Sequence, residues 1–265
     1  MTAAGFAAPK VALHLPKATP FLIEQDYAAY TAEQHAIWAE LVRRRMPQLE
    51  QHAAEEYLEG FNYLDLSYTR LPNLRALSAK LERRTGWNTT AVSGFMPGPA
   101  FFEMLAARRF PTTTWLRGRD SLEYTPEPDI FHDVFGHVPM HAHPIFADFL
   151  QHYGKVCARL TDKDKLERMG RLFWFTVEFG IIRQNGEIKL YGSGLVSSHG
   201  ESTYVIESLK NEGTKSGRGP EIRDFNLDQV LDQQFLVSEM QKVLYAVESF
   251  DQIYEAAQQA EDRLA

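Results

Sequence analysis

The chain has 265 residues, of which 44% are apolar and 24% are charged. These values fit one large or two small globular domains and exclude fibrous, collagen-like and disordered classes. The net charge of −7 disfavours sequence-independent binding to nucleic acid or to an anionic membrane surface. We therefore expect neither a nucleic-acid partner nor a membrane partner.

The cysteine content and the N-terminus bear on the compartment. Cys157 is the only cysteine of the chain, so no intrachain disulfide can form, which fits a reducing compartment. No apolar run approaches the roughly 20 residues that span a bilayer, and the N-terminal residues lack the continuous apolar core of a signal peptide. These features predict a cytoplasmic protein.

The first half of the chain alternates helical patterns with loops. Residues 1–25 contain three prolines and are interpreted as an extended arm. The pattern Thr-Ala-Glu-Gln at 31–34 predicts a helix start near Thr31, and further helices are expected over roughly 48–59 and 73–85. Glycine and proline punctuate 88–128, where we expect only two short elements, a helix near 100–109 and a strand near 113–117. A stretch this long with little regular structure is more often functional than not.

The second half is predicted to be more regular. Helices are expected to resume near Pro128, where a proline suits the first helical position, and Asn-Gly at 185–186 between alternating apolar residues predicts a β-hairpin. Because no linker is visible, the prediction is one mainly α domain over 1–265 with small β-hairpins, an α+β fold. The other expected elements are helices over 144–160, 163–179, 200–209 and 250–263, a polar loop over 211–220 and a strand over 242–247.

Five of the nine histidines lie between positions 132 and 152. His132 and His137 are five residues apart, so on an ideal α-helix their side chains are rotated by roughly 140° from one another. They can converge on one point only if the helix ends between them, and Gly136 followed by Pro139 predicts such an end. The other three histidines, in a turn or on a polar helix face, are interpreted as structural: His141, His143 and His152.

Glu178 is the leading candidate for a third ligand. It closes a strongly apolar helical segment, and a buried carboxylate without a partner is costly, so it needs a metal or a cation such as Arg171 or Arg183. Two imidazoles and one carboxylate suit non-haem Fe(II) chemistry, although zinc hydrolases also use such ligands. The zinc signature His-Glu-x-x-His is absent. Three hypotheses stay open at this point: an iron oxygenase, a zinc hydrolase, and a helical binding protein with a structural metal.

Three ordered blocks carry a resemblance to a known family. The first is His-Asp-x-x-Gly-His-Val-Pro at 132–139, preceded by Tyr-Thr-Pro-Glu-Pro-Asp at 124–129. The second is Trp-Phe-Thr-Val-Glu-Phe-Gly at 174–180, and the third is Tyr-Gly-Ser-Gly-Leu-Val-Ser-Ser at 191–198. The chain resembles the pterin-dependent aromatic amino acid hydroxylases, most nearly their bacterial phenylalanine-hydroxylating members, closely over roughly 90–210 and more loosely elsewhere.

The resemblance implies a role for each matched residue. It makes His132, His137 and Glu178 the iron ligands. Substrate-binding residues would be the carboxylate clamp Arg117, the hydrogen-bonding hydroxyls of Thr125 and Ser197, and the ring-pocket walls Trp174 and Phe179. Pterin-binding residues would be Met96 with its loop, the stacking ring Phe101, and Asp133. The chain departs from animal members at Asp133 and Phe173, where those members commonly carry Glu and Tyr.

The activity implied is a monooxygenase that converts L-phenylalanine to L-tyrosine with O2 and a tetrahydropterin at Fe(II). Phenylalanine is favoured by analogy with bacterial members, and Trp174 favours it over tryptophan, whose hydroxylases tend to have Phe there. The resemblance also implies that residues 1–265 form the catalytic domain alone, without the regulatory domain and tetramerisation helix of animal members. We therefore expect a monomer without activation by phenylalanine.

Overall fold

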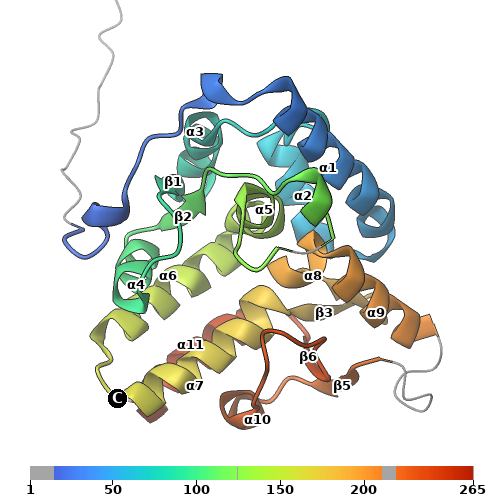
Figure 1. The fold of residues 1–265 in the computed structure, drawn as a ribbon. Coiled ribbons are helices and arrows are strands. Elements are labelled where there is room, and N and C mark those ends of the chain that lie inside the picture. Colours follow the sequence, from blue (N-terminus) through green and yellow to red (C-terminus); the bar gives the residue numbers. More distant parts are fainter. Residues whose placement is uncertain (1–14, 124, 211–218, 265) are drawn as a thin grey trace, which may run out of the picture.

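The fold is known from a computed structural model, which describes residues 15–123, 125–210 and 219–264. This part of the chain is mainly helical, and Figure 1 shows α5 near the centre of the molecule. Two π-helical segments, Phe131–His137 and Trp174–Glu178, interrupt the α-helices. The α-helices are α1 (Ala32–His52), α2 (Glu55–Leu64), α3 (Leu74–Arg84), α4 (Gly98–Ala106), α5 (Val138–His141), α6 (Pro144–Arg159), α7 (Lys163–Phe173), α8 (Ser193–Ser197), α9 (His199–Lys210), α10 (Leu227–Asp232) and α11 (Phe250–Leu264).

The strands form two small sheets, and most pairings are parallel. β1 (Asn88–Val92) pairs with β2 (Arg109–Thr113) in parallel. The second sheet has the order β4-β3-β6-β5, in which only β3 (Ile181–Gln184) and β4 (Glu187–Leu190) form a hairpin. β6 (Val243–Val247) lies parallel to both β3 and β5 (Glu221–Asp224). The α+β class is confirmed, but the expectation that hairpins make up its sheets is wrong apart from the β3–β4 hairpin.

Local sequence signals explain the elements that were predicted well. The Thr31 hydroxyl accepts from the backbone N–H of Gln34, whose side chain binds back to Thr31, so the expected capping box starts α1. In the β3–β4 turn, Asn185 and Gly186 have φ of 53° and 80°, as a type I′ turn requires. The N-cap residues Asn73 and Asp162 likewise bind the first turns of α3 and α7.

Two predicted boundaries are wrong for reasons of packing. α1 continues to His52 instead of giving way to a new helix near 48, and Pro47 lies inside it. Its buried face runs on through Met46 and Leu49, and this packing outweighs the hydrogen bond that Pro47 removes. The strand expected at 113–117 lies at Arg109–Thr113, where pairing with the unpredicted β1 fixes its register.

Some expectations fall outside the described residues. Positions 1–14 of the expected arm and 211–218 of the expected polar loop are among them. The described part of the arm includes a 3₁₀ turn at Thr19–Phe21, and Leu22 forms a β-bridge with Val92. No helix within the described ranges has both the length and the apolar character needed to cross a membrane.

Helices α4 and α6 pack closely against each other where they cross. A Cβ added at Gly154 would lie 2.6 Å from the backbone nitrogen of Ala106 and from the side chain of Leu105. The two helices can therefore cross only because α6 has no side chain at this position. α4 also carries Phe101, so this crossing fixes where that ring stands.

We expect Gly154→Ala to lower the free energy of unfolding by about 1–3 kcal/mol, the usual cost of overpacking a core. Equilibrium urea denaturation measures the change. The matched control is Gly170→Ala in α7, where nothing lies within 4 Å of an added Cβ; it should be neutral or stabilising by about 0.5–1 kcal/mol. A Gly154→Ala protein as stable as the parent would contradict this account of the helix crossing.

Candidate metal centre and the adjoining pocket

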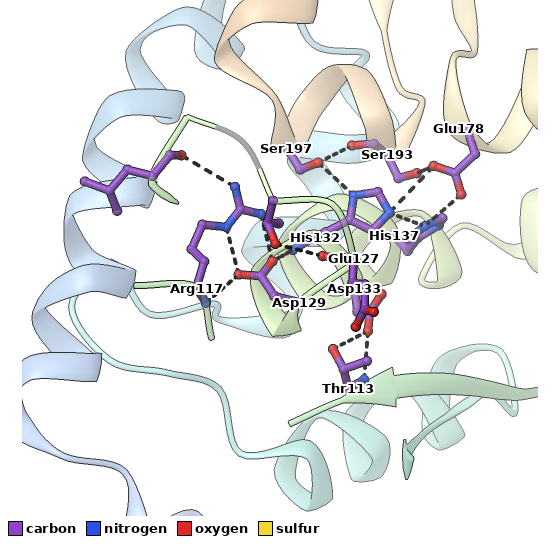
Figure 2. A network of polar contacts seen from close by, with 12 residues as sticks. Thr113, Arg117, Glu127, Asp129, His132, Asp133, His137, Glu178, Ser193 and Ser197 are labelled. Atoms are coloured by element: carbon purple, nitrogen blue, oxygen red, sulfur yellow. Dashed lines mark hydrogen bonds and ion pairs between the residues drawn. The ribbon is translucent and has the colours of Figure 1, made fainter. Parts of the chain in front are cut away.

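His132 and His137 converge because the segment that carries them is a π-helix. In a π-helix the backbone hydrogen bonds join residues that are five positions apart. Two residues with this spacing are therefore about one turn apart, and their side chains lie on nearly the same side of the helix. Their Nε2 atoms are 3.2 Å from one another, and Figure 2 shows the two side chains directed toward the same point. The expected helix end at Gly136 is wrong, since the segment passes directly into α5, where Pro139 occupies the first turn.

Glu178 completes the group from the end of the second π-helix. Its Oε1 lies 3.3 Å from His137 Nε2, and its Oε2 lies 3.6 Å from His132 Nε2. The arginines considered as alternative partners are engaged elsewhere. Arg171 donates to the carbonyl of Leu231, and Arg183 pairs with Asp224 and Glu248.

The spacing of these three donors fits one transition-metal ion. Two donors that bind an ion at about 2.1 Å and at right angles to one another lie about 3.0 Å apart. The observed separations are 3.2, 3.3 and 3.6 Å, and one ligand atom from each residue can be chosen with all within 4.8 Å. Two imidazoles and a carboxylate on one side of an ion leave the other positions open, as in non-haem Fe(II) oxygenases.

Two serines of α8 orient the ligand side chains. Ser193 donates its hydroxyl hydrogen to Glu178 Oε2 at 2.7 Å. Ser197 donates to the Ser193 carbonyl at 2.7 Å, so toward His132 Nδ1, 3.0 Å away, it can only accept. His132 therefore carries its hydrogen on Nδ1, and Nε2 presents a lone pair to the metal position.

Burial and mutual contact set the protonation states of the ligands. Burial lowers the pKa of His132 to about 4, and the facing Glu178 only partly offsets this effect. Burial alone would raise the pKa of Glu178, but the contacts with His137, His132 and Ser193 lower it to about 2. At neutral pH His132 is a neutral imidazole and Glu178 is a carboxylate. These are the forms in which the two residues bind a metal.

Asp129 is a functional residue that the sequence analysis did not assign. It is fully buried, and its carboxylate accepts from Arg117 Nε and Nη2, both at 2.8 Å. It also accepts the backbone N–H groups of Arg117 and His132, both at 3.0 Å. Its place three residues before a helical histidine is an N-cap signal that could have revealed it. Helical structure correspondingly starts after Asp129 and not at Pro128.

Asp129 determines which part of the Arg117 guanidinium stays available for the expected substrate carboxylate. Asp129 occupies the edge formed by Nε and Nη2, which is one of the two bidentate edges of the guanidinium (Figure 2). On the other edge, Nη1 makes only a 3.5 Å contact with the Leu122 carbonyl. This second edge is the one that can receive a substrate carboxylate.

A cavity of about 290 Å³ opens beside the three ligands. The three residues expected at the pterin all line this cavity: Met96, Phe101 and Asp133. The Asp133 carboxylate accepts from the backbone N–H and the hydroxyl of Thr113, both at 2.7 Å, and burial raises its pKa to about 6. The remaining lining residues are Val92, Gly94, Phe95, Gly98, Phe110, Pro111, Thr113, Pro128, His132, His137, Phe173 and Glu178.

The residues expected at the substrate ring stand outside the lining of that cavity. Trp174 stacks on Phe235 at a centroid distance of 4.3 Å, contacts Phe179 at 4.7 Å, and donates its indole N–H to Gln241 Oε1. The Thr125 hydroxyl donates to the Glu127 carbonyl within a turn, and no described hydrogen bond joins it to the ligand group. A larger cavity of about 690 Å³, between residues 15–28 and α3, contains none of the predicted site residues.

The other clustered histidines have structural contacts, as expected. His141 Nδ1 donates to the His137 carbonyl at 2.9 Å, and its ring packs on Trp87 and Phe110. His143 caps α6 by accepting the N–H of Phe146, and His152 lies 3.1 Å from a carboxylate oxygen of Glu261. None of the three belongs to the ligand group found among the described residues.

Comparison with known proteins identifies the class to which this fold and site belong. The profile of the biopterin-dependent aromatic amino acid hydroxylases matches residues 23–264, so the chain belongs to this family. It is 38% identical over 239 residues to a phenylalanine-4-hydroxylase of Chromobacterium violaceum, which covers 90% of this chain and 77% of that protein.

Solved structures of phenylalanine hydroxylase from the same organism superpose closely on the chain. One with bound Fe(III) has a TM-score of 0.85 at 38% identity, covering 92% of this chain and 86% of its own. Another holds Fe(III) and the oxidised cofactor 7,8-dihydrobiopterin. Its TM-score is 0.83 and its sequence identity is 36%, and the match covers 98% of this chain and 93% of the solved chain. The expected catalytic-domain fold of the aromatic amino acid hydroxylases is thereby confirmed.

We expect His132 in the metal-free protein to stay neutral, with its hydrogen on Nδ1, down to about pH 5. Burial disfavours the imidazolium, so protonation should have its midpoint near the lowered pKa of about 4. Nitrogen chemical shifts of selectively labelled histidine report both the charge and the tautomer.

Ser197→Ala supplies the matched variant. It removes the acceptor of the Nδ1 hydrogen, so the Nε2–H tautomer should appear. A His132 midpoint at the ordinary value near 6.5, or an unchanged tautomer in Ser197→Ala, would contradict the proposed arrangement.

Proposed function

We propose that this protein is a phenylalanine 4-monooxygenase, which converts L-phenylalanine to L-tyrosine with O2 and a tetrahydropterin at a non-haem Fe(II) centre. The observation that carries the proposal is the triad of donors from His132, His137 and Glu178 beside an apolar cavity, in a chain that belongs to the biopterin-dependent hydroxylases. The Chromobacterium relatives, named phenylalanine hydroxylases, support the choice of substrate.

His132, His137 and Glu178 would hold the iron. When bound, Fe(II) and tetrahydropterin together supply the redox chemistry of O2 that side chains cannot perform. The contribution of the chain is to keep the ligands in their metal-binding protonation states and to hold the donor atoms on one side of the ion. Ser193 contributes by its hydrogen bond to Glu178, and Ser197 by its hydrogen bond to His132. Ser197 thus acts on an iron ligand, and its expected hydrogen bond to the substrate stays a prediction.

For the substrate we propose the space between Arg117 and the aromatic pair Trp174 and Phe179. The second guanidinium edge of Arg117 would bind the amino acid carboxylate, because Asp129 fills the first. The rings of Trp174 and Phe179 would confine the phenyl ring, and apolar walls exclude water from the reacting ring. Thr125 stays a proposed hydrogen-bonding partner of the substrate, and its hydroxyl oxygen can accept while it donates to Glu127.

For the pterin we propose the 290 Å³ cavity. Phe101 offers a ring for stacking, and the loop around Met96 offers backbone groups. Thr113 binds one carboxylate oxygen of Asp133, Oδ2, so we assign Oδ1 to a pterin N–H. Phe173 also lines the cavity, and its ring offers no hydroxyl contact to the pterin.

The two alternative hypotheses receive no support. A zinc hydrolase would share the three ligands, but the family to which the chain belongs is a hydroxylase family. A binding protein with a structural metal would need a closed coordination shell. The three donors here stand beside a cavity.

We further propose a cytoplasmic monomer. The single cysteine, Cys157, is free and buried, which suits a reducing compartment. The large exposed apolar side chains of the described residues lie on five separate stretches of the sequence, namely 22–23, 68, 95, 115 and 236–240.

Size-exclusion chromatography with light scattering tests the proposed monomer, and a stable dimer at micromolar concentration would contradict it.

The first test of the proposed function is tyrosine formation from L-phenylalanine with added Fe(II) and a tetrahydropterin. Glu178→Gln should abolish iron retention and activity with little loss of helical circular dichroism, because it removes a charged ligand and preserves its shape. Glu187→Gln, at an exposed carboxylate of the β3–β4 hairpin, is the control and should retain both. Absence of pterin-dependent tyrosine formation by the iron-loaded parent protein would refute the proposed function.

A second test separates the substrate carboxylate from the iron. We expect Arg117→Lys to raise the KM for phenylalanine about tenfold or more, since an ammonium cannot serve Asp129 and a substrate carboxylate with the same geometry. The KM for the pterin should change little. Arg119→Lys, at an exposed arginine paired with Glu33, is the control. An unchanged phenylalanine KM in Arg117→Lys would exclude the clamp.

A further inference from the structure

Arg45 is a buried cation without an anionic partner. It lies on the inner face of α1, only 2% exposed, and no ion pair joins it to a carboxylate among the described residues. Burial lowers its pKa to about 10, so it is still charged at neutral pH. Arginine is rarely buried without a charged partner, so its contacts must compensate for lost hydration.

The contacts of Arg45 converge on the junction of α8 and α9. Nε donates to the Val196 carbonyl at 2.9 Å, and Nη2 donates to the Leu195 carbonyl at 3.4 Å and to the Ser202 hydroxyl at 2.7 Å. Nη1 donates to Gln48 Oε1 at 2.6 Å and lies 3.3 Å from His199 Nδ1. The guanidinium thus binds carbonyls at the C-terminal end of α8, where a cation is favoured by the helix dipole.

α8 is the helix that orients two of the three metal ligands. It spans only Ser193–Ser197, too short to be stable alone, so neighbouring elements must determine its position. On one side it packs against the first π-helix, where a Cβ added at Gly136 would lie 3.1 Å from Ser193. Elsewhere, α8 is held by the hydrogen bonds from Arg45 to the carbonyls of Leu195 and Val196.

We infer that Arg45 is a positioning residue for the metal centre, acting through α8. By holding the carbonyls of Leu195 and Val196, it fixes the helix whose serines bind Glu178 and His132. The chain of contacts runs from the Arg45 guanidinium through α8 to the Ser197 hydroxyl and the Nδ1 hydrogen of His132. This inference rests on the metal site of the proposed function.

The test is the affinity of the metal-free protein for Co(II), followed by the visible absorption of the bound ion. Arg45→Met keeps the length and apolar stem of the side chain and removes its donors. We expect it to raise the Kd for Co(II) about tenfold, the lower end of the effect of outer-shell partners, and to shift the absorption bands. Arg45→Lys should restore part of the affinity. Arg44→Met, at the partly exposed neighbour paired with Glu40 and Glu123, should bind Co(II) like the parent.

A double-mutant cycle with Ser197→Ala separates this role from general stabilisation. If Arg45 acts through Ser197, Arg45→Met should weaken Co(II) binding little further once Ser197 is alanine. Full additivity of the two effects, or parental affinity in Arg45→Met, would overturn the inference. If Arg45→Met does not fold, parental affinity in Arg45→Lys would overturn it instead.

The parent protein and Glu178→Gln distinguish failure of this inference from failure of the proposed function. If both bind Co(II) equally, the metal site itself is wrong. If only the parent binds tightly and the Arg45 variants match it, the site stands and the role of Arg45 is refuted.

Discussion

The structure depends on keeping one carboxylate and two imidazoles together inside an apolar core. The donor atoms of Glu178, His132 and His137 lie 3.2–3.6 Å from one another; His137 is buried, and the other two are partly buried beside the cavity. A buried carboxylate is costly unless it is paired and hydrogen-bonded. Ser193 offsets part of this cost, and a metal cation would offset the rest. The elements that carry these residues are correspondingly fixed from several sides.

Two π-helical segments are the backbone device that makes this grouping possible. An α-helix would separate His132 from His137 by a large rotation, whereas i to i+5 bonding brings them to one side. The second π-helix ends at Glu178 and turns its carboxylate toward the first. Such segments are rare and recur at functional sites. Here both segments that carry the ligands are π-helical, so the same departure from α-helical geometry places all three donors.

The sequence was sufficient for elements whose signals are local. Thr31 with Gln34, and Asn185 with Gly186, specify their structures through contacts within a few residues. The parallel strands β1 and β5 were missed because their partners lie far along the chain and no turn links them. The three metal-ligand candidates were found from residue type and spacing, yet the expected geometry at Gly136 was wrong, since no simple sequence pattern marks a π-helix.

Residues that support the ligands were harder to find than the ligands themselves. Asp129 stands in a proline-rich stretch where an acid looks like a turn residue; its N-cap position hints at a role, and its contacts with Arg117 and His132 define that role. Arg45 is the last of three consecutive arginines. Helical spacing from Trp38, Val42 and Leu49 places it on the buried face of α1, but charge alone would have assigned it to solvent.

The aromatic residues of the proposed site fall into two groups. In the first, Phe101 and Phe173 line the cavity, with Asp133 as a buried acid. In the second, which forms an aromatic wall, Trp174 contacts both Phe179 and Phe235, and Gln241 accepts the indole N–H. These two groups are the surfaces that we propose for a flat cofactor and a flat substrate. Because Glu178 directly precedes Phe179 and ends the segment that Trp174 begins, any shift of the ligand moves the wall, so iron binding and ring placement are mechanically linked through five residues.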